Sequence, residues 1–537
     1  MKTIFQLSIL FLIVSCSTKK PADLIVVNAN IYTVNSQFEK AEAFAVKDGK
    51  FIGIGTTEEI SNTYETDSMI DVNGKTIVPG FIDAHCHFYR MGLGEQQVKL
   101  EGTKSYDEVI ARIVAFNNEK HPDFITGRGW DQNDWPEKEF PTKDKLDSVF
   151  PDIPVAITRI DNHAMLVNQV ALDLGSVDHT TKVEGGEIIK ENGNLTGVLL
   201  DRAMDLIKAI IPKPSKATSA QALKDAERIC LDYGLTTVDE AGLYIPDIEI
   251  IDSLQQAGEM HIRIYAMPYT TDENLDFYLK QGPTKTDRLH IKGFKYVADG
   301  ALGSRGATLR EPYSDREGHY GILKDSYARL QKVAKRIAAS EFQMNSHAIG
   351  DSANHIVLNT YKRVLNGEKG RRWRVEHAQI LSPEDFKLFD DIIPSVQPTH
   401  ATSDMYWAGD RVGTERIKNA YAYKELLNTY GQVALGTDFP VEQVSPFLTF
   451  YAAVARQDTM GYPEGGFQTE NALTREETLK GMTIWAAYSN FEENEKGSIE
   501  PGKLADFIVL DQDIMTVDID EVPNIKVLQT FIDGIAR

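Results

Sequence analysis

The sequence predicts an α/β fold, a TIM-type (β/α)8 barrel with a small β domain beside it. Three observations lead to this prediction. The chain has 537 residues, which suits one large barrel plus an accessory domain. Eight short apolar segments have the composition of buried strands, and helical segments separate several of them. Such alternation favours a parallel sheet closed into a barrel.

The predicted barrel domain spans residues 77–490. Helices are expected at 219–232, 325–340 and 352–366, between buried strands. The interval 88–233 is far too long for a single connection, so we expect an insertion there. The eight candidate strands are residues 77–85, 234–240, 262–268, 291–297, 341–347, 372–377, 392–398 and 432–438.

The β domain is predicted from both chain ends. Residues 23–76 contain short strand-like segments, and turn signals such as Asp48-Gly49 and Asn73-Gly74 separate them, which is typical of hairpins. Residues 491–537 contain similar segments. Because neither part is complete alone, we expect one domain assembled from both.

The first residues have the pattern of a targeting segment. Lys2 precedes an apolar run at 4–14, which suits a signal peptide and is too short to span a bilayer. The run ends in Ile-Val-Ser-Cys, which resembles the lipobox of bacterial lipoproteins. That resemblance implies a signal peptide at 1–15, lipidation of Cys16 and a tether at 16–22. The alternative is an ordinary secretory signal with an incidental cysteine.

Charge and cysteine content exclude some classes of protein. The net charge of -22 argues against a nucleic-acid-binding surface, which needs basic patches. Three cysteines cannot build a disulfide framework. Cys86 lies between two histidines of a predicted strand, so it should point to the opposite face and pack in the core.

Residues of metal-binding or acid/base type follow the predicted strands. Parallel barrel strands bring their carboxyl ends to one face, so such residues can converge there. His85 and His87 share one strand face, and two imidazoles at this spacing can chelate a divalent ion such as zinc. The full set is His85, His87, Lys295, His347, His377 and Asp438.

Lys295 is unusual in this set because an inward ammonium would repel nearby metal ions. It must therefore be neutral, paired or converted to a carbamate, whose two oxygens could bridge two metals. A salt bridge to Asp299 is the alternative. Asp438 could both ligate a metal and accept a proton, and two metals could share a hydroxide nucleophile.

Several motifs together resemble the amidohydrolase superfamily. They are PGFIDAHCH, GFKYVADGALGSRGATL, NSHAIGDSAN, RVEHAQ, SVQPTH, GTDFPV and GSIEPGKLADFIVLD. The resemblance covers nearly all of residues 22–537 and is strongest to the branch called amidohydrolase family 3, which includes N-substituted formamide deformylases. It implies a distorted TIM barrel with a composite β-sandwich built from both chain ends.

The resemblance also implies residue roles and cofactors. His85, His87 and Asp438 would hold the more buried metal, while His347 and His377 would hold a second. A carboxylated Lys295 would bridge the two, and Asp438 would double as the proton shuttle. Members of this branch work with one or two divalent metals, and we expect zinc.

Five further residues are candidates for substrate binding, each with a structural role as the alternative. His163 lies in the insertion, where this branch would place substrate-facing residues, and His400 follows the seventh strand. Trp130 and Asp131 could line the pocket, and Arg305 could hold a substrate anion.

The sequence therefore predicts an exported, lipid-anchored hydrolase of non-peptide carbon–nitrogen bonds, acting on a small amide-type substrate through a metal-bound hydroxide. His400 or His163 could stabilise the oxyanion. We expect no nucleic-acid partner, membrane attachment only through the N-terminal lipid, and a location on the periplasmic side of the outer membrane. The alternatives are a cyclic amidase or esterase with the same site, and an inactive periplasmic binding lipoprotein.

Overall fold

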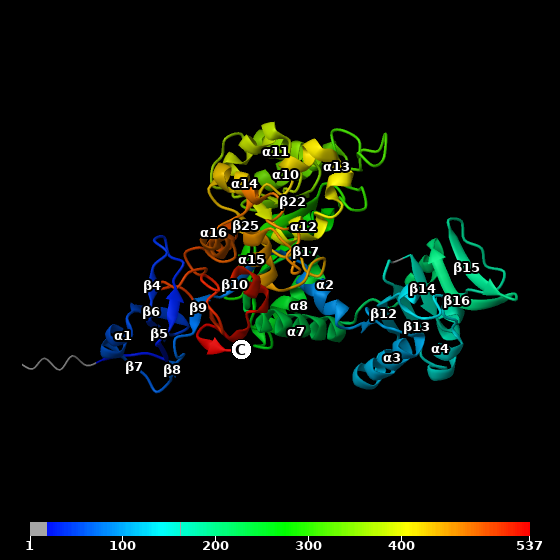
Figure 1. The fold of residues 1–537 in the computed structure, drawn as a ribbon, viewed down its shortest axis with the longest axis horizontal. Coiled ribbons are helices and arrows are strands. Elements are labelled where there is room, and N and C mark those ends of the chain that lie inside the picture. The colour runs from blue at the N-terminus through cyan, green and yellow to red at the C-terminus, as the bar shows by residue number, and fades with distance from the viewer. Residues whose placement is uncertain (1–18, 162) are drawn as a thin grey trace, which may run out of the picture.

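The computed structural model describes residues 19–161 and 163–537, so the predicted signal peptide and Cys16 lie outside the described residues. Figure 1 shows a two-sheet β unit at one end, a central α/β part, and a separate lobe at the other end. Within residues 19–161 and 163–537, no helix is both long enough and apolar enough to cross a membrane.

The central part contains two parallel sheets that follow each other in the chain. In the second sheet all neighbouring strands pair in parallel: β21 (Gly293–Val297), β22 (Gln343–Ala348), β23 (Arg374–His377), β24 (Ile393–Val396) and β25 (Ala434–Leu435). The first sheet is parallel apart from its last edge strand: β10 (Phe81–Cys86), β17 (Leu235–Leu243), β18 (Arg263–Pro268), β20 (Leu289–Ile291) and β19 (Thr284–Lys285).

Backbone contacts join these two sheets at two places. At one junction Tyr269 forms a parallel bridge with Lys295. At the other, the amide of Asp438 donates to the carbonyl of His85 at 2.8 Å, and the amide of His87 donates to the carbonyl of Phe439 at 2.8 Å. The result is a distorted TIM-barrel-like arrangement, as the sequence predicted.

The predicted helices are present and cover the sheets. In α10 (Tyr327–Ala338) the buried residues Leu330, Val333, Ala334 and Ile337 recur at helical spacing, and Ser326 caps the amino end. Further helices on the central part are α7 (Lys216–Asp232), α8 (Ile245–Gln256), α9 (Asp272–Gln281), α11 (Asp351–Leu365), α14 (Tyr423–Tyr430), α15 (Pro446–Ala455), α16 (Arg475–Gly481) and α17 (Ile484–Ser489).

The first predicted strand, 77–85, is in fact two strands. The chain leaves β9 (Thr76–Pro79) at Gly80 and enters β10. A Cβ at Gly80 would lie 2.3 Å from Oγ1 of Thr236, so only glycine fits where the chain crosses. Strand β9 belongs to the β unit, which therefore extends to Pro79 instead of ending at residue 76.

The β unit has two sheets, one formed by N-terminal strands and the other by strands from both chain ends. One has the order β6 (Lys50–Gly55), β5 (Ala43–Lys47), β2 (Leu24–Val27) and β8 (Met69–Asp71). The other has the order β28 (Ile535–Ala536), β27 (Val527–Ile532), β26 (Phe507–Leu510), β9, β3 (Asn30–Tyr32) and β4 (Lys40–Ala41). The rings of Phe44 and Phe507 meet between the sheets, with centroids 4.8 Å apart.

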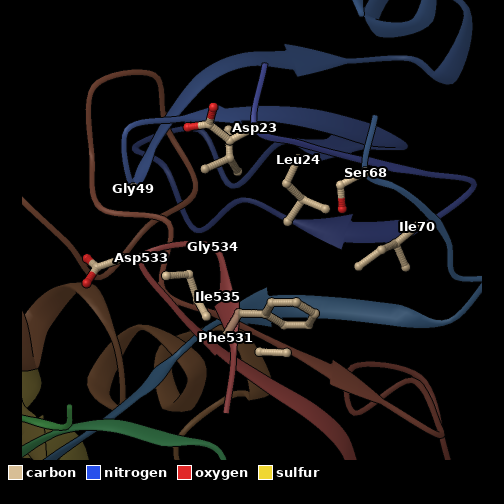
Figure 2. A pocket seen from close by; sticks show the side chains of 11 residues that line it. Asp23, Leu24, Gly49, Ser68, Ile70, Phe531, Asp533, Gly534 and Ile535 are labelled. Atoms are coloured by element: carbon tan, nitrogen blue, oxygen red, sulfur yellow. The ribbon is translucent and has the colours of Figure 1, made fainter. Parts of the chain in front are cut away.

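Pairing in the β unit begins earlier than the sequence predicted. The expected tether reached residue 22, but β1 (Lys20–Pro21) pairs in parallel with β7 (Tyr64–Glu65). The same unit holds a cavity of about 370 Å³ (Figure 2), lined among others by Asp23, Ile70, Phe531 and Asp533. None of the predicted metal ligands lines this cavity.

The predicted insertion forms the separate lobe, which stands beside the central part in Figure 1. Its six-stranded sheet has a hydrophobic core on each face, one under α3 (Tyr106–Lys120) and α4 (Asp144–Val149), the other under α5 (Gln169–Leu174) and α6 (Asp205–Lys208). The sheet order is β11 (Val98–Lys99), β12 (Ile125–Trp130), β13 (Val155–Arg159), β14 (Ala164–Val167), β16 (Asn194–Asp201) and β15 (Gly186–Glu191).

Candidate metal centre

Four predicted ligands meet at the carboxyl ends of the central strands. His85 comes from β10, Lys295 from β21, His347 from β22 and His377 from β23. The imidazole of His377 lies 4.9 Å from that of His85 and 4.4 Å from that of His347, centroid to centroid. Nζ of Lys295 lies 3.0 Å from Nε2 of His85. Residues up to 292 positions apart in the chain thus form one cluster.

Asp438 completes the cluster from the loop that follows β25. Its Oδ1 lies 3.3 Å from Nε2 of His87 and 3.7 Å from Nε2 of His85. Its Oδ2 lies 3.2 Å from Nε2 of His400, which is carried by α12 (Pro398–Asp404). Two sets of three side chains each bring their ligand atoms within 4.8 Å of one another: His85, His87 and Asp438, and His377, His400 and Asp438.

Unusual backbone conformations direct two of these side chains. His377 has φ +73° and Asp438 has φ +63°, in the left-handed region that few non-glycine residues adopt. Along β23, strict alternation would put His377 on the face opposite Glu376. The positive φ at the end of the strand breaks that alternation, and the His377 ring reaches the other histidines. Such conformations cost about 1–3 kcal/mol each and occur preferentially at functional sites.

A glycine lets the last strand approach the first one closely. A Cβ at Gly436 would lie 2.5 Å from the amide nitrogen of His85 and 2.8 Å from Oδ1 of Asp83. The carboxylate of Asp83 accepts hydrogen bonds from the amides of His85 and Thr437 and from the Thr437 hydroxyl, the last at 2.6 Å. These contacts fix the position of Asp438 relative to His85.

Burial keeps the imidazoles of His85 and His347 unprotonated. Burial, with the nearby Lys295 ammonium, lowers the pKa of His85 to about 4 and that of His347 to about 3. Burial also lowers the pKa of Lys295 to about 8, although the carboxylates of Glu376 and Asp438 oppose the shift. Neutral imidazoles are the form that binds metals.

Asp438 and His400 form an ion pair. Burial alone would raise the pKa of Asp438, but the hydrogen bond from His400 and the nearby His87 imidazole hold it well below its usual value. Burial alone would lower the pKa of His400, but hydrogen bonds to Asp438 and Glu442 raise it to about 10. Nδ1 of His400 lies 3.1 Å from Oε1 of Glu442. The His400 imidazolium is therefore held between two carboxylates.

The donor set fits a divalent metal. Among the described residues, Nε2 of His347, Nδ1 of His377 and Oδ1 of Asp438 are buried without a hydrogen-bond partner. Buried polar atoms are normally paired, so three unpaired nitrogen and oxygen atoms within one cluster fit the ligand set of a cation. Imidazole and carboxylate together suit zinc and similar ions.

Within the described residues, Lys295 forms no ion pair with Asp299. The salt bridge considered as the alternative role of Lys295 is therefore not present among these residues. The carboxylate of Asp299 instead accepts hydrogen bonds from the amides of Thr308, Ile349 and Gly350 at 2.8–3.0 Å. This carboxylate organises the loops that follow β21 and β22.

Two acidic residues of the site were missed by the sequence analysis. Glu376 contacts Nδ1 of His85, and Glu442 contacts Nδ1 of His400. The only signal for Glu376 was an acidic residue inside a fully buried strand, directly before His377. Glu442 follows Asp438 by four residues in a loop, where no pattern marks it.

Four of the predicted substrate-binding residues have partners outside this cluster. Trp130 and Asp131 belong to the lobe, as does His163, whose side chain is 75% exposed and bonded to Asp201. The Trp130 side chain is fully buried and donates to the carbonyl of Ile157. Arg305 forms a bidentate ion pair with Asp315, at 2.7 and 3.0 Å.

Asp131 is likewise paired, since it accepts a hydrogen bond from Arg159 at 2.6 Å. Of the five substrate-binding candidates, only His400 lies beside Asp438 in this structure. Contact of His163, Trp130, Asp131 or Arg305 with a substrate remains a prediction.

Comparisons with known proteins agree with this geometry. The chain is 32% identical to Protein LONG AFTER FAR-RED 3 of Arabidopsis thaliana, over 96% of this chain and 91% of that protein. It is 27% identical to N-substituted formamide deformylase of Arthrobacter pascens, over 96% of this chain and 98% of that enzyme.

A similar structure has been solved. An uncharacterised metal-dependent hydrolase from Pyrococcus horikoshii OT3 superposes with a TM-score of 0.78 at 28% identity, covering 92% of this chain and 99% of that one. The model of the Amidohydrolase family, Amidohydro_3, matches residues 68–535. With this match and the histidine–aspartate clusters in place, the chain belongs to the Amidohydrolase family and is a hydrolase.

Proposed function

We propose that this protein hydrolyses non-peptide carbon–nitrogen bonds of small amide-type substrates with the help of one or two divalent metal ions. The observation that carries the proposal is that imidazole nitrogens without hydrogen-bond partners among the described residues lie close to the carboxylate of Asp438, where they could bind a metal. N-substituted formamides are the first substrates to consider, because the relative from Arthrobacter pascens is named for their deformylation.

A zinc ion in this site would supply Lewis-acid activation of water and of the substrate carbonyl. His85, His87 and Asp438 would hold one ion, and His347 and His377 would hold a second. Lys295 suits conversion to a carbamate, because its amine is buried and its pKa is lowered to about 8. The neutral amine adds to carbon dioxide and loses one proton, giving an anion with two donor oxygens.

Asp438 has the geometry of a proton shuttle. Its Oδ1 faces the histidine cluster and has no hydrogen-bond donor among the described residues, whereas its Oδ2 is held by His400. The free oxygen can accept a proton as water adds to the carbonyl carbon. It can return that proton to the departing amine when the carbon–nitrogen bond breaks. His400 holds Asp438 in place for both transfers.

The test is hydrolysis by the purified, zinc-supplemented protein of N-substituted formamides, other N-acyl amines, cyclic amides and esters. We expect release of a primary or secondary amine, loss of activity with a chelator, and recovery with added zinc. Hydrolysis of esters alone would favour the esterase alternative. Binding of these compounds without turnover would contradict the proposal and favour a binding protein.

We also propose that the protein is exported and anchored by a lipid on Cys16, on the periplasmic side of the outer membrane. The support is the apolar run at 4–14 followed by Ile-Val-Ser-Cys. Strand pairing starts at Lys20, four residues after that cysteine, so the anchor would hold the β unit close to the membrane surface.

A further inference from the structure

Glu376 links the candidate metal centre to a buried arginine. The two carboxylate oxygens of Glu376 point in opposite directions. Oε2 lies 2.5 Å from Nδ1 of His85, and Oε1 accepts a hydrogen bond from Nε of Arg374 at 2.8 Å. All three side chains are completely buried. Glu376 and Arg374 are two positions apart in β23, so they share one strand face.

Arg374 is fixed by further partners below Glu376. Nη1 donates to Oδ2 of Asp239 at 2.8 Å and to Oδ1 of Asn490 at 3.2 Å, and Nη2 donates to the carbonyl of Ala84. Nδ2 of Asn490 in turn donates to the other oxygen of Asp239 at 2.6 Å. The guanidinium therefore has one available position, and it fixes the orientation of the Glu376 carboxylate.

This network is not explained by stability alone. Desolvation of buried ion pairs is costly, and replacing them by apolar residues of similar volume is often neutral or stabilising. A buried group of Arg374, Glu376 and Asp239 next to His85 therefore points to a requirement of the site.

The hydrogen bond to Glu376 determines which His85 nitrogen carries the proton. An ionised carboxylate can only accept, so Nδ1 of His85 must be the donor. The lone pair is then on Nε2, which accepts a hydrogen bond from Nζ of Lys295 at 3.0 Å and lies 3.7 Å from Oδ1 of Asp438. That is the nitrogen that a metal in this cluster would need.

We propose that Glu376, held by Arg374, is a positioning residue that fixes the tautomer and ring orientation of His85 for metal binding. The inference rests on the metal dependence in the proposed function. Carboxylates that accept from a metal-ligating histidine orient the ring and raise its basicity, and their loss typically lowers metal affinity about 10–100-fold.

Glu376→Gln tests this role with almost no change in shape. Arg374 can only donate, so the glutamine oxygen should turn towards its Nε and the amide NH2 towards His85. Nδ1 of His85 must then accept, and the proton moves to Nε2. We expect the zinc affinity of the metal-free protein to fall by about 10–100-fold, measured by competition with a chromophoric chelator.

A second readout uses no metal and no substrate. In metal-free protein with 15N-labelled histidines, the ring-nitrogen shifts report the tautomer, and His85→Asn identifies the His85 signals. We expect Nδ1–H in the wild type and Nε2–H in Glu376→Gln. Glu376→Asp keeps the charge and the contact with Arg374 but shortens the reach to His85, so it should fold and lose affinity to a smaller extent.

Glu227→Gln is the matched control. Glu227 is also a buried glutamate, but it lies on α7 and accepts hydrogen bonds from the amides of His261 and Ile262. The Glu227→Gln substitution should leave the zinc affinity unchanged. Folded Glu376 variants with an affinity within threefold of the wild type, or an unchanged His85 tautomer in Glu376→Gln, would overturn the inference. If Glu376→Gln does not fold, the affinity of Glu376→Asp decides.

The outcome can be separated from that of the proposed function. If the wild type binds no zinc, metal-dependent hydrolysis is contradicted. If the His85 tautomer nevertheless differs between the wild type and Glu376→Gln, control of the ring by Glu376 is supported. A wild type that binds zinc and hydrolyses none of the tested compounds would leave the affinity comparison intact.

Discussion

Asp438→Asn should separate proton transfer from metal binding. Asparagine is nearly isosteric and can still place its oxygen where Oδ1 or Oδ2 lies, so the fold and much of the metal should remain. It cannot take a proton at neutral pH. General acid–base groups contribute about 10²–10⁴ in rate. At 1.36 kcal/mol per decade, we expect the barrier to rise by about 2.7–5.4 kcal/mol.

The structure adds an expectation about pH. In the wild type, the hydrogen bond from His400 and the nearby His87 imidazole hold the pKa of Asp438 well below its usual value, so it is ionised at neutral pH. The variant keeps no ionisable group at this position. The acidic limb of the pH–rate profile should therefore change, whereas an effect on folding alone would leave its shape intact.

The assay is turnover of a substrate from the hydrolysis screen by zinc-loaded protein, with metal content and melting temperature measured on the same sample. Asp410→Asn, an exposed aspartate on α13 (Ala408–Arg416), is the matched control and should keep wild-type turnover. Turnover by metal-loaded Asp438→Asn within threefold of the wild type would refute the shuttle.

Three further predictions follow from other parts of the chain. Cys16→Ala should release the protein from membranes or block its maturation, and fractionation like the wild type would contradict lipidation. Gly436→Ala should cost about 1–3 kcal/mol of stability and reduce zinc content, because a Cβ would lie 2.5 Å from the amide of His85; unchanged zinc content would argue against that contact. Asp506→Asn removes a buried partner of Arg263 and should cost about 3–5 kcal/mol near pH 7 in denaturant unfolding. Burial alone would raise the pKa of Asp506, but Arg263 lowers it. The loss of stability in Asp506→Asn should therefore shrink as the pH falls below about 4 and through the folded-state pKa. A loss of stability that does not depend on pH would contradict the pairing.

The convergence of the site was predictable because parallel strands impose it. His85 and His347 lie near the ends of buried strands and Lys295 lies within one, and a barrel-like arrangement brings such strands together whatever their separation in the chain. In the structure the strands of the lobe, β11 to β16, come between β10 and β17 in the chain.

The approach of His377 could not be derived from alternation, which places it on the opposite face from Glu376. Its left-handed φ has no sequence signature, since histidine rarely adopts it. The role of Glu376 was missed for a different reason. The function of a glutamate in a buried strand can be recognised only when its partner is known. The placement of His163 depended on how the lobe sits beside the central part, which local patterns do not determine.

The β unit also imposes an order on biosynthesis. Strand β9 pairs with β26, and Asn30 donates to Asp513, 483 positions later. The second sheet of the β unit can therefore be completed only when almost the whole chain has been made and, if it is exported, translocated. Until then β9 has an unpaired edge, of the kind that recruits other chains. Chains that end before β26 should accumulate as aggregates or be degraded, even when every metal ligand is present.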